Sequence, residues 1–302
     1  MAVHVVGNVG LDTTFRLARF PEPGETLNAS AVTVALGGKG ANQALSAQRA
    51  GAVTTLWAPL GADAEAEAVR RGVEREAMPT RGLTVLPDTP TDRSTILVDE
   101  GGENLIASAV DCARRFDPLA SGWLGQAEAG DVLVLQNNLA PQATRAALSR
   151  GRPLGLNTVL NASPLGQNEA VPVDLADVVV VNRVEGEALT GEREPGRIAT
   201  GLLGRGARAA VVTLGSEGAV VQAAGEGEAR RHPAEPARAI DTSGAGDVFC
   251  GTLAARLSLG EPLDRAVRLA IAAAAVAVTR HGTFGCGPTR AEFQIIETRE
   301  NA

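Results

Sequence analysis

The sequence of 302 residues has no tyrosine, only 3% aromatic residues, three cysteines and no basic run. The cysteines, Cys112, Cys250 and Cys286, are odd in number and lack a CxxC pair, which argues against a zinc site and fits a reducing compartment. A formal net charge of -7 does not indicate a nucleic-acid partner. Because no leader pattern or membrane-length apolar run is present, we expect a cytoplasmic protein without a membrane partner.

Lysine is almost absent, since Lys39 is the one lysine among 28 Lys and Arg residues. Genome composition that favours arginine codons accounts for the general bias. Lys39 nevertheless lies inside the glycine-rich stretch Gly37 to Asn42, where a compact ammonium is not interchangeable with a planar guanidinium. Its position therefore favours a functional role.

Short apolar runs alternate with helical patterns along the chain, which is 44% hydrophobic and 21% charged. Strands that alternate with helices indicate right-handed βαβ units and a parallel sheet, in one large α/β domain or two smaller ones. We expect buried strands at 3–6, 53–57, 132–135, 153–157, 177–181 and 209–213, and helices at 63–76, 143–150 and 266–279.

A second, smaller sheet is expected from three further segments. Residues 30–36 alternate like a half-exposed strand, and residues 91–98 and 104–109 bracket a glycine-rich turn at 99–103. The last two segments therefore predict a β-hairpin.

The stretch Asp241 to Leu257 combines a turn of small residues with the start of an apolar helix. Backbone N–H groups at Gly244 to Gly246 would form an anion site there, where the helix dipole contributes roughly 0.3–1 kcal/mol. Asp247 in the first turn would take a proton from a group that attacks a phosphate. The alternative is that Asp247 caps the helix, and this segment alone leaves both open.

Two other glycine turns exclude common nucleotide-binding classes. Gly37 to Asn42 is not a Walker A loop, because the Gly-Lys pair has no following Ser or Thr. Gly7 to Gly10 is not a dinucleotide fingerprint, which disfavours an oxidoreductase. Asp12, just after the first strand, is either a ligand contact or part of an Asx turn.

Asn182 and Glu185 lie three residues apart at a strand-to-helix junction. They form either a capping pair or a site where Glu185 organises a hydrated magnesium ion. The turn from Leu214 to Gly218 has a backbone that could line a nucleotide. The three histidines show no metal spacing, so we assign them no catalytic role.

The stretches Gly37 to Ala44 and Asp241 to Asp247 resemble the two signatures of the carbohydrate kinases of the ribokinase (PfkB) family. Residues 20–25, 182–185 and 213–218 match the same family in order and spacing, so the resemblance spans the chain. It implies a single kinase domain over 1–302 with a ribokinase-like three-layer α/β/α fold, a mostly parallel central sheet and a small β-sheet lid from about 12–36 and 91–110. Lids of this type often pair to form homodimers.

The resemblance also implies a role for each matching residue. Asp247 would be the catalytic base, and the amides of Gly244, Ala245 and Gly246 would hold the phosphoryl group. The sugar would be bound by Asp12, Gly38, Lys39, Gly40, Asn42, Asn138 and Asp247. ATP would contact Asn182, Thr213, Gly215, Ser216, Gly218 and Gly246. Glu185 would act through Mg²⁺, and a monovalent cation, K⁺, would lie at Asp241, Ser243, Ala277, Arg280, Gly282 and Cys286.

Two departures from the family pattern fall among the sugar contacts. Gly10 stands where ribokinases usually carry Asn, and Asn137 or Asn138, near Gln136, stands where they carry Glu. We expect an ATP-dependent kinase acting on the primary hydroxyl of a small sugar, D-ribose or a related pentose. The alternatives are a nucleoside, fructose or another hexose, or a keto-deoxy sugar acid. A non-catalytic sugar- or nucleotide-binding regulator would require loss of the base or the anion hole, and both are present.

Overall fold

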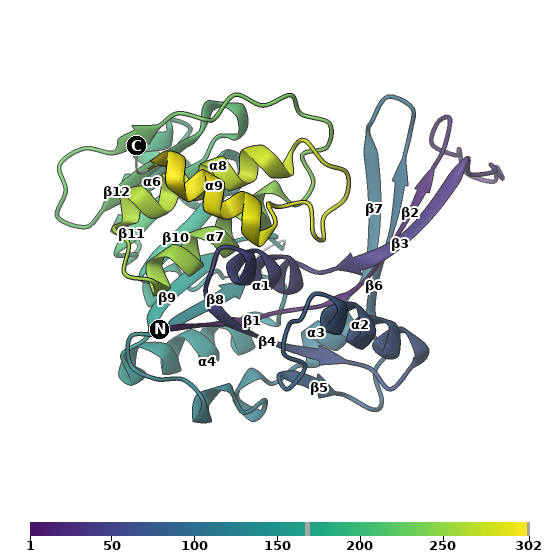
Figure 1. The fold of residues 1–302 in the computed structure, drawn as a ribbon, viewed down its shortest axis with the longest axis horizontal. Coiled ribbons are helices and arrows are strands. Elements are labelled where there is room, and N and C mark those ends of the chain that lie inside the picture. Colours follow the sequence, from purple (N-terminus) through teal and green to yellow (C-terminus); the bar gives the residue numbers. More distant parts are fainter. Residues whose placement is uncertain (167–169, 301–302) are drawn as a thin grey trace.

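A nine-stranded sheet crosses the middle of the protein in the computed structural model, which describes residues 1–166 and 170–300 (Figure 1). Its strand order is β13-β12-β11-β10-β9-β8-β1-β4-β5, and all neighbours are parallel except the pairs that β12 makes with β11 and β13. The strands are β1 Ala2–Val6, β4 Val53–Leu60, β5 Leu83–Val85, β8 Val132–Gln136, β9 Asn157–Asn161, β10 Val178–Asn182, β11 Ala209–Thr213, β12 Ala219–Ala223 and β13 Arg230–His232.

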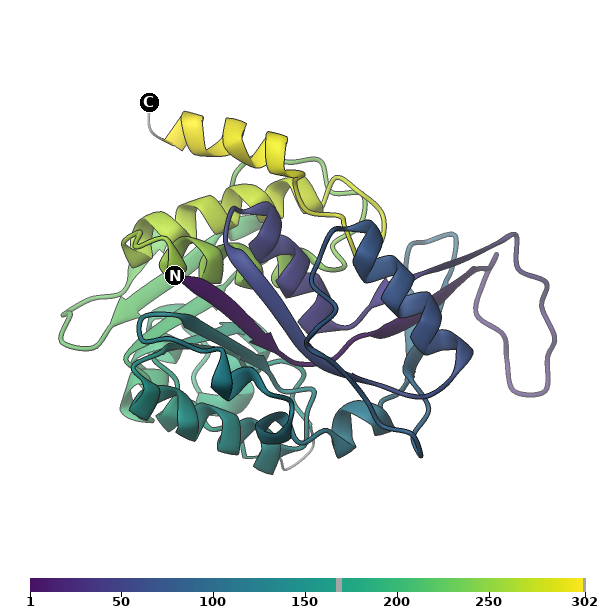
Figure 2. The same cartoon turned by 60° about the horizontal axis from the view of Figure 1, so that its bottom comes forward.

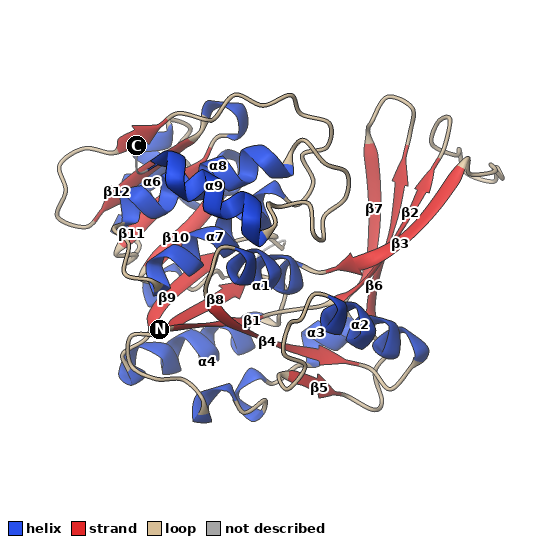
Figure 3. Ribbon diagram, in the orientation of Figure 1, coloured by secondary structure: helices blue, strands red, loops and turns tan. Residues whose placement is uncertain are grey.

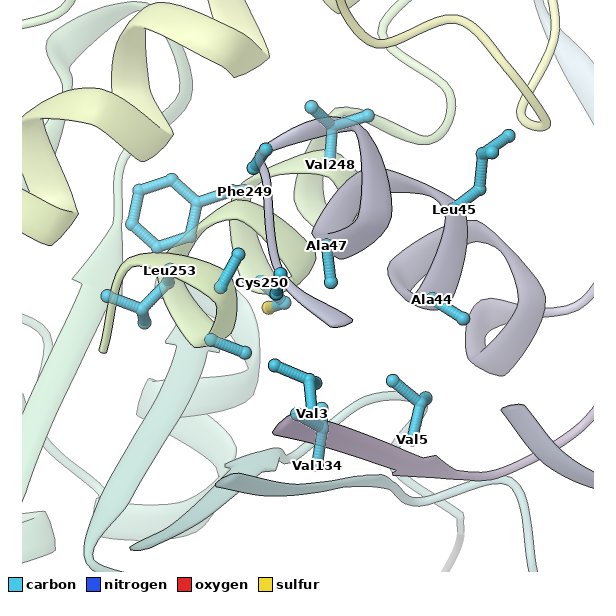
Figure 4. Close-up of a cluster of buried hydrophobic side chains, with 14 of the residues drawn as sticks. Val3, Val5, Ala44, Leu45, Ala47, Val134, Val248, Phe249, Cys250 and Leu253 are labelled. Atoms are coloured by element: carbon cyan, nitrogen blue, oxygen red, sulfur yellow. The ribbon is translucent and has the colours of Figure 1, made fainter. Parts of the chain in front are cut away.

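Side-chain alternation along the central strands builds a core on each face of this sheet. Val3 and Val5 of β1 join one buried cluster, and Val6 joins the other. Figure 4 shows the first cluster, where Val3, Val5 and Val134 of the strands lie beneath side chains of α1 and α7. A strand buried on both faces reads as a continuous apolar run, which is why the sequence predicted these strands.

Helices cover both faces of the sheet, and Figure 2 shows the C-terminal helices in yellow and yellow-green opposite the teal helices. One face carries α1 Lys39–Arg49, α2 Ala64–Arg75, α7 Ala245–Ser258, α8 Leu263–Ala277 and α9 Arg290–Glu300. The other carries α3 Asp111–Arg115, α4 Pro141–Gly151, α5 Arg183–Thr190 and α6 Pro195–Gly204. None of the helices in these described stretches combines the length and apolar character needed to cross a bilayer.

A separate four-stranded sheet projects from this body (Figure 3). It contains β2 Gly10–Arg16, β3 Ala31–Gly37, β6 Asp92–Val98 and β7 Asn104–Ala109, in the order β3-β2-β6-β7. The predicted hairpin is confirmed, because β6 and β7 pair antiparallel. The expected three-layer α/β/α fold with a small second sheet is therefore what the chain forms.

The predicted strand at 153–157 was wrong. Residues 152–154 form a 3₁₀ turn, and Gly155 takes a left-handed φ of 72°. The strand begins only at Asn157, where the β-branched residues Thr158 and Val159 follow. Of the two alternatives for Asp12, the structure does not support the Asx turn, because Asp12 lies inside strand β2 of the small sheet.

The carboxyl ends of the parallel strands lie along one edge of the sheet, and the strand order reverses at that edge between β1 and β8. In open α/β sheets this edge is where ligands bind. Four adjacent strands, β8 to β11, each end there in a polar side chain, namely Gln136, Asn161, Asn182 and Thr213. The strand ends therefore supply a row of hydrogen-bonding groups to one site.

Candidate active site

Asp247 lies in the first turn of α7 and is only 5% exposed. Its Oδ2 accepts a hydrogen bond from Asn42 Nδ2 at 3.0 Å, and its Oδ1 accepts one from Gln43 Nε2 at 2.9 Å. Lys39 Nζ lies 3.8 Å from the same Oδ1. A buried carboxylate needs such partners. Helix α1 provides all three, so it holds Asp247 in one orientation.

Lys39 is the first residue of α1, and its side chain is 33% exposed. The charge of Asp247 raises the pKa of Lys39, burial opposes that effect, and the charge of Glu185 adds to it. Lys39 is therefore a cation at neutral pH that interacts with two carboxylates. This lysine brings a positive charge to the predicted path of the phosphoryl group.

The N-terminus of α7 carries no side-chain cap, and the N-cap residue, Gly244, has a left-handed φ of 76°. A Cβ on Gly244 would lie 2.8 Å from the Thr283 carbonyl oxygen, whereas a Cβ on Gly246 would meet nothing within 4 Å. The Ala245 N–H donates to the Thr242 carbonyl at 3.4 Å. Uncapped N–H groups beside open space can donate hydrogen bonds to an anion, so the geometry fits the predicted phosphoryl site.

The glycine-rich turn before α1 packs closely against the turn that follows β1. Gly38 has a left-handed φ of 97°, and a Cβ on Gly40 would lie 2.6 Å from the Asn8 carbonyl oxygen. Asn8 Oδ1 accepts a hydrogen bond from the Gly40 N–H at 3.3 Å, and the Asn8 carbonyl accepts one from Ala41 at 3.1 Å. This contact fixes the start of α1 and with it the positions of Lys39 and Asn42.

Asp12 faces the main body from the small sheet. Its Oδ2 accepts a hydrogen bond from Thr283 Oγ1 at 3.3 Å, and a Cβ on Gly37 would lie 2.2 Å from that oxygen. Burial raises the pKa of Asp12, hydrogen bonds from Ser94 and Thr283 oppose the rise, and the charge of Asp247 adds to it. The two carboxylates therefore belong to one electrostatic site shared by both sheets.

A cleft of about 740 Å³ lies between the small sheet and the main body. Such a volume is in the range of small-molecule sites. Asp12 lines it together with Thr14, Thr33 and Ile96 of the small sheet and with the segments 239–243 and 281–284. Lys39, Asn42, Asn138 and Asp247 are not part of its lining. Asp12 is thus the predicted sugar contact that opens onto the cleft.

The two asparagines after β8 differ in their surroundings. Asn137 Nδ2 donates to the Pro164 carbonyl at 2.9 Å, which gives this side chain a structural partner. Asn138 Oδ1 is buried and has no hydrogen-bond partner among the residues described. Asn137 Oδ1 is likewise buried without a partner among the described residues, so each of the two asparagines retains an acceptor for a ligand.

Asn182 and Glu185 form a capping box at the start of α5. Asn182 Oδ1 accepts from the Glu185 N–H at 2.8 Å, and Glu185 Oε2 accepts from the Asn182 N–H at 2.8 Å. The capping alternative is therefore confirmed, and it leaves Glu185 Oε1 for another task. Asn182 pairs in register with Thr213 of β11, which places both predicted nucleotide contacts at one edge of the sheet.

The turn after β11 is a short 3₁₀ segment, Gly215–Glu217, that includes Ser216. Gly218 has a φ of 93°, and a Cβ there would lie 2.0 Å from the His232 carbonyl oxygen. Glu217 bridges Arg183 Nη2 at 2.7 Å and Arg231 Nη2 at 2.6 Å. These arginines beside the predicted nucleotide contacts were not identified from the sequence.

The residues predicted to hold a monovalent cation lie in two facing segments. Asp241 accepts hydrogen bonds from the N–H groups of Ser243 at 2.8 Å and Gly282 at 2.9 Å. Burial would raise the pKa of Asp241, but these donors outweigh it and the pKa is lowered. Cys286 Sγ lies 3.9 Å from the Ser243 carbonyl oxygen, and Ala277 O accepts from the Arg280 N–H. The segments thus offer an ionised carboxylate and nearby carbonyl groups.

The Arg280 side chain does not join that group, because its guanidinium donates to the Gly287 carbonyl at 2.8 Å and to Glu292 at 2.6 Å. Only its backbone is available to a cation. Within residues 1–166 and 170–300, no cluster of three or more His, Cys, Asp or Glu side chains could hold a metal ion.

Gln43, Gln136 and Asn161 are buried polar residues of the site that the sequence did not single out. They form a chain of amides: Gln136 Nε2 donates to Gln43 Oε1 at 2.8 Å, and Gln43 Nε2 donates to Asn161 Oδ1 at 3.2 Å. One signal was present, since Gln136 and Asn161 each end an apolar strand segment. Without the strand register, nothing in the sequence connected them to Asp247.

Residues 3–290 of the chain match the pfkB family of carbohydrate kinases. A ribokinase of Mus musculus is 31% identical over 310 residues, covering 97% of this chain and 94% of that protein. A ribokinase of Haemophilus influenzae is 29% identical over 307 residues, covering 99% and 98%. A deoxyribokinase of Salmonella typhi is 28% identical over 308 residues, covering 97% of each.

Solved structures show the same likeness. The crystal structure of a ribokinase from Thermotoga maritima superimposes with a TM-score of 0.86 and 28% identity, covering 98% of this chain and 99% of that one. The structure of a ribokinase from Cryptococcus neoformans in complex with ADP gives a TM-score of 0.82 and 28% identity, covering 99% of each chain.

Proposed function

The chain belongs to the pfkB family of carbohydrate kinases and is a phosphotransferase with an alcohol group as acceptor, and on this basis we propose that it transfers the γ-phosphoryl group of ATP to the primary hydroxyl of D-ribose. The observation that carries this proposal is the position of Asp247. Its carboxylate is held by two side-chain amides next to the uncapped N-terminus of α7. A base and an anion site are thus adjacent.

In the proposed reaction Asp247 takes the proton of the attacking sugar hydroxyl. The N–H groups of Gly244, Ala245 and Gly246 stabilise the charge on the transferring phosphoryl group, and Lys39 adds a cation beside it. Phosphoryl transfer requires mainly such positioning and electrostatic stabilisation from the protein. The arrangement supports this assignment because it combines these parts around one point at the carboxyl edge of the sheet.

ATP would lie along the ends of β10 and β11, with Asn182, Thr213, Gly215, Ser216 and Gly218 as contacts. Glu185 would hold Mg²⁺ through water, since one of its carboxylate oxygens already caps α5. When bound with ATP, Mg²⁺ neutralises charge on the phosphates. The ionised Asp241 and the carbonyls near it support a K⁺ site that would also include Ser243, Ala277, Arg280, Gly282 and Cys286.

The sugar would bind between the small sheet and α1, contacted by Asp12, Gly38, Lys39, Gly40, Asn42 and Asn138. An uncharged Asn138 in place of the family's usual Glu would change one sugar contact from a carboxylate to an amide. Relatives named ribokinase support ribose, whereas the deoxyribokinase of Salmonella typhi, together with this changed contact, makes deoxyribose a second candidate.

A screen of acceptors tests the proposal. ADP release is measured with ribose, deoxyribose, other pentoses, hexoses, keto-deoxy sugar acids and nucleosides, with and without K⁺. We expect ribose to give the highest kcat/KM and K⁺ to raise it. A strong response to another acceptor with none to ribose would refute the choice of ribose, and binding without turnover on any acceptor would favour the non-catalytic regulator.

We also expect the small sheet to mediate a homodimer. Val32 and Val34 of β3 are 53% and 62% exposed, and Leu105 of β7 is 52% exposed. Exposed apolar side chains gathered on one sheet are typical of an interaction surface. Sedimentation velocity should therefore report a dimer that Val34→Glu dissociates. A monomeric parent protein would contradict this expectation.

A further inference from the structure

The amide of Gln43 uses each of its hydrogen-bonding groups. Its Nε2 donates to Asp247 Oδ1 at 2.9 Å and to Asn161 Oδ1 at 3.2 Å, while its Oε1 accepts from Gln136 Nε2 at 2.8 Å. The partners come from α7, from the end of β9 and from the end of β8. Three elements therefore determine which end of the Gln43 amide faces Asp247.

The orientation of these hydrogen-bonded amides is fixed at Asn161 by a backbone carbonyl. Asn161 Nδ2 donates to the Val180 carbonyl at 3.4 Å, and a carbonyl oxygen can only accept. Asn161 must then present Oδ1 to Gln43, and Gln43 must present Nε2 in return. The same orientation follows from Gln136, whose Nε2 occupies the Gln43 oxygen.

The contribution of Gln136 to stability does not by itself explain why a glutamine is at this position. The residue is 1% exposed, and its Oε1 has no hydrogen-bond partner among the described residues. An unsatisfied buried acceptor destabilises the fold. A Cβ at Gly7 would lie 2.1 Å from that oxygen and 3.0 Å from Gly40 Cα, so glycine in the turn after β1 leaves room for both. Its favourable contribution is the hydrogen bond that it donates to Gln43.

We propose that Gln43 and Gln136 are positioning residues for the base of phosphoryl transfer: Gln136 holds the Gln43 amide in the orientation that Asn161 also requires, and Gln43 orients the Asp247 carboxylate toward the acceptor hydroxyl. The inference rests on the proposed function, because it concerns the base of that reaction. With one amide on each oxygen, Asp247 keeps its remaining lone pairs for the hydroxyl.

Four other titratable groups interact electrostatically with Asp247. They are Lys39 of α1, Cys250 of α7, Cys286 of the segment after α8, and Asp12 of the small sheet. Burial raises the pKa of Cys250 well above its usual range and that of Cys286 to about 11, so both thiols are neutral at physiological pH. Among these four groups Lys39 is the cation.

Two substitutions of Gln136 distinguish a positioning role from a purely structural one. Gln136→Met removes the unsatisfied oxygen of Gln136 but also leaves Gln43 Oε1 without its donor, so the two effects on stability oppose each other. Stability to urea should therefore change little, while kcat falls about threefold to tenfold. The KM for the sugar should stay within about twofold, because binding groups are untouched. Lower stability with an unchanged kcat would show that Gln136 is only structural.

Gln136→Glu replaces the hydrogen-bond donor at this position with an acceptor. A carboxylate cannot donate to Gln43 Oε1 and instead accepts from Nε2, which would turn the amide so that its oxygen faces Asp247. We expect kcat to fall about 100-fold, with the KM for the sugar within about twofold of the parent value. A fall in kcat no greater than that of Gln136→Met would contradict the proposal.

A double-mutant cycle with Gln43→Met tests whether Gln136 acts through Gln43. If it does, Gln136→Met should have no further effect on kcat once Gln43 is Met. Additive losses would overturn the proposed chain.

NMR of the Gln43 side-chain amide gives a reading that needs no substrate. Its N–H₂ resonances should shift in Gln136→Met and further in Gln136→Glu, where the amide turns, and unchanged resonances would overturn the positioning role. A protein that shows these shifts but turns over no acceptor would retain the amide chain and refute the proposed function instead.

Discussion

Asp247→Asn should lower kcat by about 10² to 10⁴, the usual loss when a general base is removed. Asn cannot take the proton of the sugar hydroxyl. Its amide group would also point an N–H₂ at either Asn42 or Gln43, both of which donate to Asp247 in the parent protein. The KM for ATP should change little, because the nucleotide contacts at the ends of β10 and β11 are unaffected.

Steady-state kinetics and urea unfolding of the same preparation measure this effect. The protein should remain folded, since the buried core clusters do not depend on this carboxylate. Asp88→Asn is the matched control, because Asp88 is exposed and lies outside the site. A kcat close to that of the parent protein would show that Asp247 is not the base.

Gly246→Ala should lower activity without lowering stability. A Cβ at this position meets nothing within 4 Å, so the fold can accept it. Alanine in a helix is favoured over glycine by up to about 1 kcal/mol, and the free energy of unfolding should therefore stay constant or rise. If a phosphoryl group must approach the backbone here, the methyl group occupies that space, and kcat/KM should fall about 10²-fold or more.

Gly204→Ala is the control for this experiment. Gly204 is also a helical residue with open space at its Cβ, but it ends α6, far from the site in the fold. It should show the same small gain in stability with unchanged kinetics. Normal kcat/KM in Gly246→Ala would mean that the phosphoryl group does not approach the start of α7.

The layers of the fold could be predicted because buried parallel strands are continuous apolar runs. Residues 209–213 form strand β11 with the bounds that the sequence indicated, and residues 104–109 form β7 of the small sheet. The failure at 153–157 has a local cause. Leu154 and Leu156 look like part of a strand, but Pro153 continues a 3₁₀ turn and Gly155 takes a left-handed conformation.

The centre of the site could be predicted only in part. The glycine turn before α7 and the isolated Lys39 are local features that the sequence shows directly. They are far apart in the sequence, and only the family resemblance assigned them to one site. The hydrogen bond from Asn42 Nδ2 to Asp247 could not be read from the sequence, and Asn42 Oδ1 is buried without a partner among the described residues. The amide chain through Gln43 and Gln136 depends on the register of β8 and β9, which is a property of the folded sheet.

The most direct test of the account is to identify the product formed from ATP and D-ribose by the parent protein and by Asp247→Asn. A phosphate ester on a primary carbon gives a triplet in the proton-coupled ³¹P NMR spectrum, because two hydrogens are bound to that carbon. The account predicts this triplet for the parent protein, with accumulation strongly reduced in Asp247→Asn. A doublet from a secondary ester, or inorganic phosphate as the only product, would contradict it.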